Sequence, residues 1–516
     1  MTSASDAGAD SRTDASPVDA RSFDVHAGEA SVTIAVDSTH SQPLPPRFSG
    51  VNSEQPMNAA EFWDTRLIAA SEALAPAWVR FPSGTLSDVY DWTSGNLITD
   101  WISSFDAEVK GSGAVTLLTD VLFADAVPLT RGKGFVTLDK FVPFANALDA
   151  ATIVCVNGYT DTPTSAGAYA TSVLSQGLTV KEWEIGNEPY LYTALFPTST
   201  SYADAMKPYA QQILAVDPSA VIGLFWAGLW SGGDASWNDG YATYADPYWN
   251  AISIHLYPIT ESSTPIDQAI AVLNGVLAHG TVDYVASQLV PTNRPDLKVF
   301  VTEVNASGAT NPISTTIFDG VFLVEYVARM STSANVQGVG THVLYASNTQ
   351  QTGLIRAAND HDSDVVAAYK AGTTIDTASL DFGYYASAPG LALQVANVAF
   401  NTSTASLATT VAGGGEVPAN NLDGGAGAPI PSVYAQAYMG AGKHHLVVTN
   451  KSSTAESALL QVDGASVLGT LQLSTVSADD PSLANVPGAT SRVQIVASTS
   501  TGAIPIPAYS VTRVDW

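Results

Sequence analysis

The sequence predicts an α/β chain: a (β/α)8 TIM barrel with an accessory antiparallel β-sandwich domain. Two observations lead to this prediction. Between residues 47 and 350, eight short apolar runs alternate with longer amphipathic stretches. From 351 to 516 the pattern changes to short alternating strands divided by Gly, Pro, Asn and Ser clusters. Alternating strands and helices form parallel sheets, and eight such units are typical of a barrel, whereas short strands with frequent turns are typical of a sandwich.

The strand-like runs of the barrel are apolar and rich in β-branched residues: 47–54, 77–84, 151–159, 180–188, 220–228, 251–258, 298–306 and 336–346. Helical patterns, with apolar residues three and four apart, lie between several of them: 138–148, 166–175, 202–216, 266–278 and 320–331. One additional run, Val115–Phe123, is assigned to the long loop after the second strand.

The second domain is predicted from alternating strands separated by turn residues: Ser432–Tyr438, His444–Val448, Arg492–Val496 and Ala508–Val514. No long helical pattern is evident after residue 380. An alternating segment at Ser31–Asp37, within 22–46, is expected to add an N-terminal strand to the same sandwich. Residues 1–21 are rich in Ser, Asp, Ala and Thr without an apolar stretch, and are interpreted as a disordered leader.

Composition narrows the functional classes. The chain has 20 Lys and Arg against 48 Asp and Glu, a formal charge of −28, so we expect neither nucleic acid nor a membrane as partner. No run of about 18 apolar residues is present. The single cysteine, Cys155, excludes an intrachain disulfide and is expected to be a buried, inert thiol. Without His-x-His or HExxH patterns, no metal and no cofactor is expected.

Two acidic residues stand where an active site is expected. The active site of such a barrel lies at the carboxyl ends of its strands. Glu188 ends the fourth strand-like run and Glu303 lies near the end of the seventh. Retaining glycoside hydrolysis uses a pair of carboxyl groups about 5–5.5 Å apart, one as acid/base and one as nucleophile. Strands four and seven face each other across the barrel, so the two side chains can meet there.

Four short motifs carry a family resemblance. Trp183-Glu-Ile-Gly-Asn-Glu-Pro189 resembles the acid/base signature of the clan A glycoside hydrolases, and Thr302-Glu-Val-Asn305 resembles that clan's nucleophile on strand seven. His255-Leu-Tyr257 is similar to the clan's His-x-Tyr on strand six. Arg80-Phe-Pro-Ser-Gly-Thr85, followed by Tyr90-Asp-Trp92, resembles the second strand of families 51 and 79, which also carry a sandwich built from both ends of the chain.

The resemblance implies roles for these residues. Glu188 would be the acid/base and Glu303 the nucleophile. Asn187 would bind the sugar 2-hydroxyl, while His255 and Tyr257 would line the site and hold the nucleophile. Other substrate-binding candidates are Glu54, which corresponds to a strand-one glutamate of family 51, Arg80 and Trp226.

Strand parity adds two expectations. Glu182, Glu184 and Glu188 share parity and should point into the barrel, where Arg80 is the expected partner of Glu184. Trp92, Tyr190, Trp226 and Tyr257 are candidates for stacking on sugar rings. Glu325, in the helix after the seventh strand, is interpreted as a solvated or capping charge.

Three functions stay open at this stage. The motif Glu-Ile-Gly-Asn-Glu-Pro favours family 79, the family of β-glucuronidases and heparanase-like enzymes, although no basic cluster that could bind a uronate is evident. An α-L-arabinofuranosidase or another neutral glycosidase of the clan is the alternative. A non-catalytic carbohydrate-binding protein is the alternative of another class. The expected partner is a glycoside or oligosaccharide. The expected location is extracellular or extracytoplasmic, and the oligomeric state is open.

Overall fold

The computed structural model describes residues 30–53, 64–82, 84–97, 137–228, 235–279, 294, 296–308, 311–346, 352–359, 361, 364, 379–421 and 424–516. Three sequence predictions lie outside these residues: the leader at 1–21, the run Val115–Phe123 and the site candidate Glu54.

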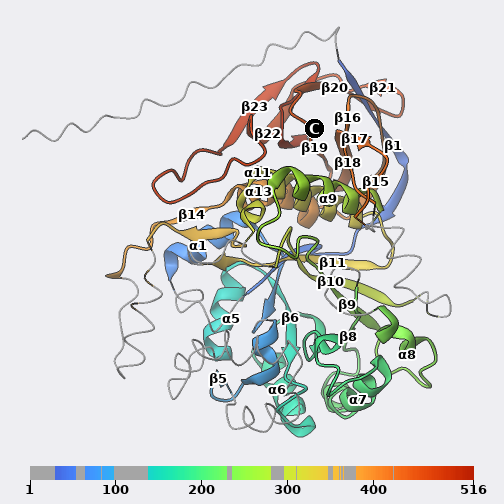
Figure 1. Ribbon diagram of the computed structural model, residues 1–516, viewed down its shortest axis with the longest axis vertical. Coiled ribbons are helices and arrows are strands. Elements are labelled where there is room, and N and C mark those ends of the chain that lie inside the picture. Colours follow the sequence, from blue (N-terminus) through green and yellow to red (C-terminus); the bar gives the residue numbers. More distant parts are fainter. Residues whose placement is uncertain are drawn as a thin grey trace, which may run out of the picture.

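Eight parallel strands form a closed barrel (Figure 1). In chain order they are β2 (Ser49–Asn52), β3 (Trp78–Phe81), β6 (Ala151–Val156), β7 (Val180–Ile185), β8 (Ile222–Phe225), β9 (Ala251–Leu256), β10 (Lys298–Val304) and β11 (Val336–Thr341). Each pairs with the next, and β11 pairs with β2 to close the ring. Every strand falls inside one of the runs expected from the sequence, so the predicted (β/α)8 barrel is confirmed.

Helices surround the barrel: α1 (Thr65–Leu74), α5 (Leu138–Ala147), α6 (Pro163–Ser175), α7 (Ser199–Val216), α8 (Asp239–Ala242), α9 (Ile266–His279), α11 (Ile317–Met330) and α13 (Ala388–Thr402). Local signals set their starts. The hydroxyl of Thr198 and the side chain of Ser201 form a reciprocal capping box at the start of α7. Ser387 caps α13, which has a proline in its first turn.

Helix α13 lies after residue 380, where the sequence shows no long helical pattern, so that expectation is wrong. It packs against α1 and α11 and so serves as the eighth barrel helix, although it begins well after residue 350. The sequence shows no clear amphipathic pattern there because α13 is buried on most sides, between its helical neighbours and strands of the second domain. A helix that is apolar all round loses the periodicity that identifies surface helices.

The second domain is a ten-stranded sheet that curls around its own apolar core. Its strands are β1 (Val32–Pro43), β15 (Ala405–Gly413), β18 (Val433–Gly440), β19 (Lys443–Asn450), β20 (Glu456–Val462), β21 (Ala465–Ser466), β22 (Leu471–Ser477), β23 (Ile495–Ser500), β24 (Ile504–Ile506) and β25 (Ser510–Asp515). As expected, β1 joins the C-terminal strands. It lies antiparallel to β15 but parallel to β20, a pairing that departs from the antiparallel expectation.

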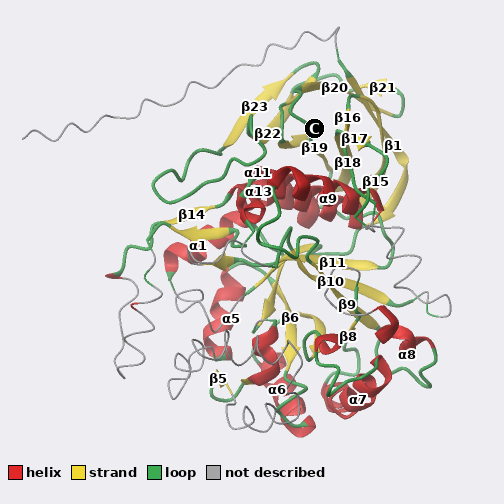
Figure 2. Ribbon diagram, in the orientation of Figure 1, coloured by secondary structure: helices red, strands yellow, loops and turns green. Residues whose placement is uncertain are grey.

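Short strands complete the architecture: β4 (Tyr90–Asp91), β5 (Asn96–Leu97), β12 (Tyr345–Ala346), β13 (Ile355–Ala357), β14 (Tyr384–Ala386), β16 (Glu416–Val417) and β17 (Ile430–Pro431). Figure 2 shows helices α9, α11 and α13 between the barrel strands and the large sheet. Helices α11 and α13 both contact β19 and β25, so the sheet packs on this side of the barrel. None of the helices in the described part of the chain combines the length and hydropathy needed to cross a bilayer.

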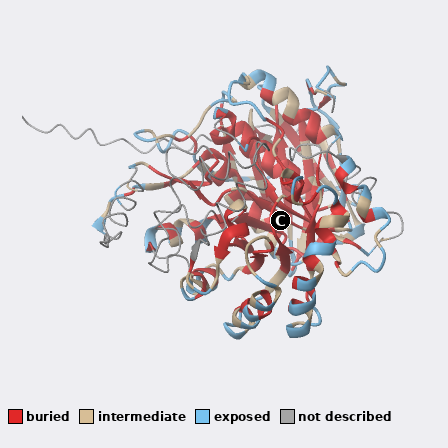
Figure 3. Ribbon diagram, turned by 60° about the horizontal axis from the view of Figure 1, so that its bottom comes forward, coloured by how far each residue is buried: buried red, intermediate tan, exposed pale blue. Residues whose placement is uncertain are grey.

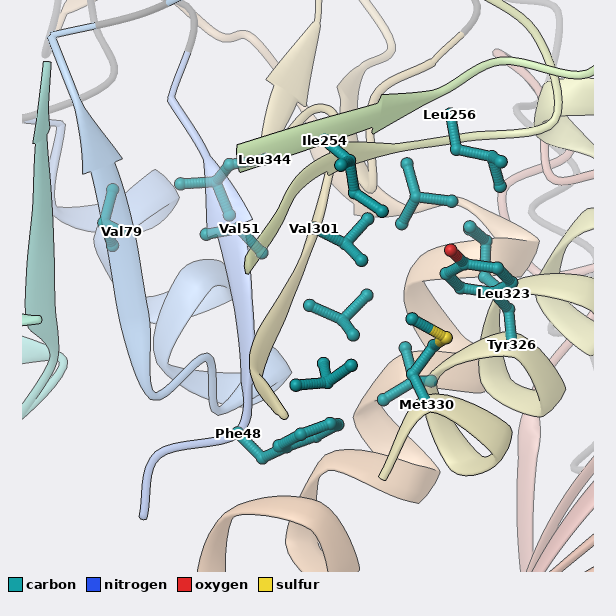
Figure 4. Packing of buried hydrophobic residues seen from close by; sticks show 14 of the residues in the cluster. Phe48, Val51, Val79, Ile254, Leu256, Val301, Leu323, Tyr326, Met330 and Leu344 are labelled. Atoms are coloured by element: carbon teal, nitrogen blue, oxygen red, sulfur yellow. The ribbon is translucent and has the colours of Figure 1, made fainter. Parts of the chain in front are cut away.

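Apolar side chains bury the outer surface of the barrel strands against the helices. Figure 4 shows Val51, Val301 and Ile254 from the strands facing Leu323 and Tyr326 of α11. Each fully buried side chain of this kind contributes about 1.5–3 kcal/mol. The strands and inner helix faces are buried, while outer helix faces stay exposed (Figure 3).

Inside the barrel, Trp78 forms an apolar floor. Its indole is fully buried and packs with Ile153 and Phe300. The close approach of β2 requires glycine at position 50, because a Cβ there would lie 2.1 Å from the Trp78 ring. Polar side chains above Trp78 therefore face the opposite end of the barrel, where the strands have their carboxyl ends.

Glu325 on α11 is not the solvated charge that the sequence indicates. Its side chain is fully buried and lies 2.6 Å from the ammonium group of Lys451, which is also fully buried. Arg329 binds Oε1 of the same carboxylate at 2.8 Å, and the hydroxyl of Thr449 donates to Oε2. Burial opposes ionisation of Glu325, but these cations outweigh it and lower its pKa. The cluster joins a barrel helix to the second domain.

Replacing Lys451 with Met should lower the free energy of unfolding by about 3 kcal/mol, because it leaves a buried carboxylate with fewer partners. Calorimetry of the variant and the wild type measures the change. Lys443→Met, at an exposed lysine of the neighbouring strand β19, is the matched control and should change the melting temperature little. Equal melting temperatures for both variants would contradict a stabilising role for the cluster.

Candidate active site

A layer of charged side chains lies above Trp78, with Arg80 at its centre. The guanidinium is completely buried and donates in three directions. Its Nε lies 2.5 Å from Glu184 Oε2, Nη1 lies 2.6 Å from Glu303 Oε1, and Nη2 lies 2.8 Å from Asn187 Oδ1. The ion pair predicted between Arg80 and Glu184 is therefore present. A planar guanidinium suits this task because its donors point along fixed, divergent directions.

Glu303 of β10 is held on both carboxylate oxygens. Oε1 accepts from Arg80, and Oε2 accepts from the hydroxyl of Tyr257 at 2.5 Å. The ring nitrogen Nδ1 of His255 lies 3.4 Å from Oε2. Burial opposes ionisation, but the positive charges of His255, His342 and Arg80 and the Tyr257 hydrogen bond outweigh it, so the pKa of Glu303 falls to about 2. Glu303 is thus a carboxylate at ordinary pH.

Glu188 reaches the same place by a turn. Strand β7 ends at Ile185, and Gly186 and Glu188 both have positive φ angles, 77° and 44°. Strand parity therefore does not extend to Glu188, and the turn itself aims the side chain. Its Oε1 accepts from the hydroxyl of Tyr190 at 2.8 Å and lies 2.9 Å from His255 Nδ1.

The two candidate catalytic carboxyl groups lie close together. Both approach Nδ1 of His255, Glu188 Oε1 at 2.9 Å and Glu303 Oε2 at 3.4 Å. These two oxygens can be no farther apart than the two distances combined, so one histidine ring contacts both carboxyl groups.

Other predicted site residues differ in their placement. Asn187 lies in the layer around Arg80 and is almost fully buried. Trp226 instead stacks on Tyr241 with ring centroids 5.8 Å apart, and lines a cavity of about 190 Å³ together with Trp249. Trp92 stacks on Tyr169 of α6, again with rings in contact. The sugar-stacking roles of Trp226 and Trp92 stay predictions.

Thr302, the first residue of the motif that contains Glu303, also belongs to the site, although the motif alone implies no role for its side chain. Its hydroxyl contacts both Glu184 Oε1, at 2.8 Å, and His255 Nε2, at 3.1 Å. In a regular strand, neighbours 302 and 303 would point to opposite faces. The pairing of β10 with β9 has a β-bulge between Val301 and Glu303, which lets both side chains enter the barrel. Alternation in sequence gives no signal for such a bulge.

Gly84 is a second residue whose role needs the structure. A Cβ at this position would lie 2.6 Å from Glu303 Oε1, so a larger residue would displace the carboxylate from Arg80. Cys155 is buried, as expected, and its thiol faces Glu184 Oε2 at 3.4 Å. Within the described residues, no group of His, Cys, Asp and Glu is arranged to hold a metal ion.

Comparison with known proteins identifies solved structures with a similar fold. The chain matches no protein-family profile and no curated protein sequence. Solved structures do match: the α-L-arabinofuranosidase from Thermotoga maritima, in complex with arabinose, aligns with a TM-score of 0.67 at 16% identity, covering 94% of this chain and 100% of that one. The chain has the fold of the clan A glycoside hydrolases.

Two further structures show the breadth of this similarity. The family 51 arabinofuranosidase from Xanthomonas axonopodis pv. citri aligns with a TM-score of 0.66 at 14% identity, over 94% of this chain and 100% of that one. A 4-O-α-L-rhamnosyl-β-D-glucuronidase from Fusarium oxysporum aligns with a TM-score of 0.58 at 14% identity, over 93% of this chain and 100% of that one. The resemblance to clan A, family 51 included, holds at the level of the fold, and these structures do not single out family 79.

Replacing Tyr257 with Phe should raise the pKa of Glu303 from about 2 toward its ordinary value, because the carboxylate loses a hydrogen bond that favours the charged form. The folded pKa lies below the unfolded value of about 4.3, so ionised Glu303 adds stability above that value, which is lost as pH falls toward 2. In Tyr257→Phe the pH range between the folded and unfolded pKa values of Glu303 should become narrower. Carbon-13 NMR of labelled glutamate measures the titration directly.

Tyr169→Phe is the control, because the hydroxyl of this buried tyrosine has no hydrogen-bond partner among the described residues. It should leave the Glu303 titration in place. If Tyr257→Phe left it in place as well, the hydrogen bond would not contribute to keeping Glu303 ionised.

Proposed function

We propose that the chain is a glycoside hydrolase that works with net retention, with Glu303 as nucleophile and Glu188 as acid/base. The observation that carries the proposal is the unlike environment of two carboxyl groups that share one histidine. Glu303 is ionised by the surrounding cations and held on both oxygens. Glu188 is more exposed, 15% against 7% of the side chain, and contacts Tyr190 and His255. Paired carboxyl groups in unlike surroundings are typical of acid/base and nucleophile assignments.

In the first step Glu303 would attack the anomeric carbon while Glu188 gives its proton to the leaving oxygen. In the second step Glu188 would take a proton from water, and that water would release the sugar from Glu303. Glu303 attacks the anomeric carbon on the face opposite the leaving group, and water then attacks on the face opposite Glu303. Two inversions retain the anomeric configuration.

Asn187 has one hydrogen-bonding group left for a substrate. Its Oδ1 accepts from Arg80 at 2.8 Å, so the amide orientation is fixed and Nδ2 is the group it offers. That nitrogen makes a long contact of 3.4 Å with the hydroxyl of Thr85. An N–H donor beside the nucleophile supports the binding of a sugar 2-hydroxyl, an interaction that strengthens in the transition state.

Of the candidate sugars, we place α-L-arabinofuranosides first. The described site is acidic: Glu184, Glu188 and Glu303 surround Arg80 and His255, and the guanidinium already has three acceptors. A neutral sugar avoids setting another carboxylate among them. The higher structural similarity to arabinofuranosidases points the same way. A β-glucuronide, which the sequence favours, is the second candidate because of the Glu-Ile-Gly-Asn-Glu-Pro motif and the Fusarium structure.

The first test is hydrolysis of aryl α-L-arabinofuranoside, β-D-glucuronide, β-D-xyloside and β-D-glucoside, with the product anomer followed by proton NMR. We expect turnover of the arabinofuranoside with retention. Turnover of the glucuronide alone would make it the first candidate substrate in place of the arabinofuranoside, and the proposed mechanism would be unchanged. An inverted product would show that Glu303 is not a nucleophile.

Glu303→Gln should abolish turnover, and Glu188→Gln should lower kcat by roughly 10²–10⁴-fold, the usual contribution of general acid–base catalysis. Glu72→Gln, at an exposed glutamate of α1, is the matched control and should keep wild-type activity. The alternative function is a non-catalytic carbohydrate-binding protein, which would bind sugar but show no turnover even as the wild type. Calorimetric titration of the inactive variants with the substrate measures binding separately from turnover.

A further inference from the structure

A chain of buried hydrogen bonds crosses the barrel behind the two catalytic candidates. The hydroxyl of Thr302 donates to Glu184 Oε1 at 2.8 Å. The oxygen of that hydroxyl, Thr302 Oγ1, lies 3.1 Å from His255 Nε2. On the other side of the ring, His255 Nδ1 lies 2.9 Å from Glu188 Oε1. Glu184 and Thr302 are completely buried and His255 is 2% exposed, so water does not provide alternative partners for this chain.

Counting hydrogens fixes the form of the histidine. Glu184 accepts on both oxygens, from Arg80 on Oε2 and from Thr302 on Oε1, and so acts as a carboxylate. Thr302 has a single hydroxyl hydrogen, which goes to Glu184. Its oxygen can therefore only accept from His255, and Nε2 must carry a hydrogen. The remaining nitrogen, Nδ1, is the one whose protonation can change, and it faces Glu188.

We propose that Glu184 and Thr302 are positioning residues that hold His255 in its Nε2–H form, so that Nδ1 shares with Glu188 the proton used in catalysis. This inference rests on the proposed function of Glu188 and adds a role that the pair of glutamates alone does not require.

The contact between Nδ1 and Glu188 exists only while the pair holds a proton. If Nδ1 is bare, Glu188 must donate; if Glu188 is ionised, Nδ1 must donate. Loss of that proton would set a lone pair against a carboxylate at 2.9 Å, so the arrangement retains the proton until a leaving group takes it. The proton balance closes, because the pair gives one proton to the leaving oxygen and regains one from the attacking water.

The surroundings of His255 also favour a proton on its ring. Burial alone disfavours the charged ring, but Glu303 and Glu188 outweigh it and raise the pKa of His255, while Arg80 opposes them. Phe225 of β8 covers the ring edge-on at a centroid distance of 5.2 Å. The charged and titratable groups that face the ring or its partners come from β3, β7 and its following turn, β9, β10 and the segment after β11: Arg80, Glu184, Glu188, Tyr190, Tyr257, Glu303 and His342.

Thr302→Val tests the proposal, because it keeps the shape of the side chain and removes the acceptor for Nε2–H. The ring hydrogen should then move to Nδ1, where ionised Glu188 accepts it. Nitrogen-15 NMR of labelled histidine distinguishes the two forms, and His255→Gln identifies its signals among the eight histidines. Since Nδ1–H stabilises ionised Glu188, the alkaline limb of kcat/KM should move to lower pH by about 1 unit.

Two variants serve as controls. Thr302→Ser restores the hydroxyl and should restore both the Nε2–H form and the pH profile. Thr152→Val removes the hydroxyl of another fully buried barrel threonine, one without a hydrogen-bond partner among the described residues. It should change neither the form of His255 nor the pH profile.

Glu188→Gln is a second test of the proposal. It should lower the pH at which Nδ1 of His255 loses its hydrogen, because a negatively charged neighbour is lost.

The outcomes separate this inference from the proposed function. Retention of Nε2–H in Thr302→Val, or an Nδ1 titration that does not respond to Glu188→Gln, would overturn the inference even if the wild type cleaves glycosides. The NMR measurements need no substrate. If no glycoside is cleaved but both NMR responses occur, the proposed function fails while the positioning of His255 stands.

Discussion

The buried guanidinium of Arg80 is the constraint on which the site depends. A charge with no exposure to water needs partners in several directions, and here they come from β7, the turn after it and β10. Satisfying Arg80 therefore ties together segments on opposite sides of the barrel. Trp78 prevents the cluster from relaxing downward, since the indole fills the barrel beneath it. The contact with Glu303 helps to neutralise Arg80, and the same contact helps to keep Glu303 ionised.

The two carboxyl groups differ because their neighbours differ. Cations and a tyrosine hydroxyl surround Glu303, whereas Glu188 stands nearer to solvent, next to Tyr190 and a histidine that can give or take a proton. Neither environment follows from the side chain itself. His255 contacts both glutamates and is held from behind by Thr302, so one ring couples the nucleophile, the acid/base and the buried carboxylate of Glu184.

Much of this arrangement could be predicted from the sequence, because it depends on periodicity and on short motifs. All eight barrel strands, the joining of β1 to the second domain and the pairing of Arg80 with Glu184 could be predicted in this way. The remainder could not, for physical reasons. The bulge at Thr302 and the left-handed turn at Glu188 break strand alternation locally. Helix α13 lacks an amphipathic pattern because it is buried on most sides, and Glu325 finds its partner Lys451 far along the chain.

Strand β1 has a consequence for the order in which the protein can assemble. It lies between β15 and β20, with one antiparallel and one parallel partner, and the whole barrel separates it from both in the chain. During synthesis on the ribosome, β1 precedes the barrel strands and cannot form its native pairs until β15 and β20 have been made. The barrel can become compact in that interval because all its strands precede β15. The native pairings of β1 can thus form only after the barrel strands have been synthesised, and they place both ends of the described chain in one sheet.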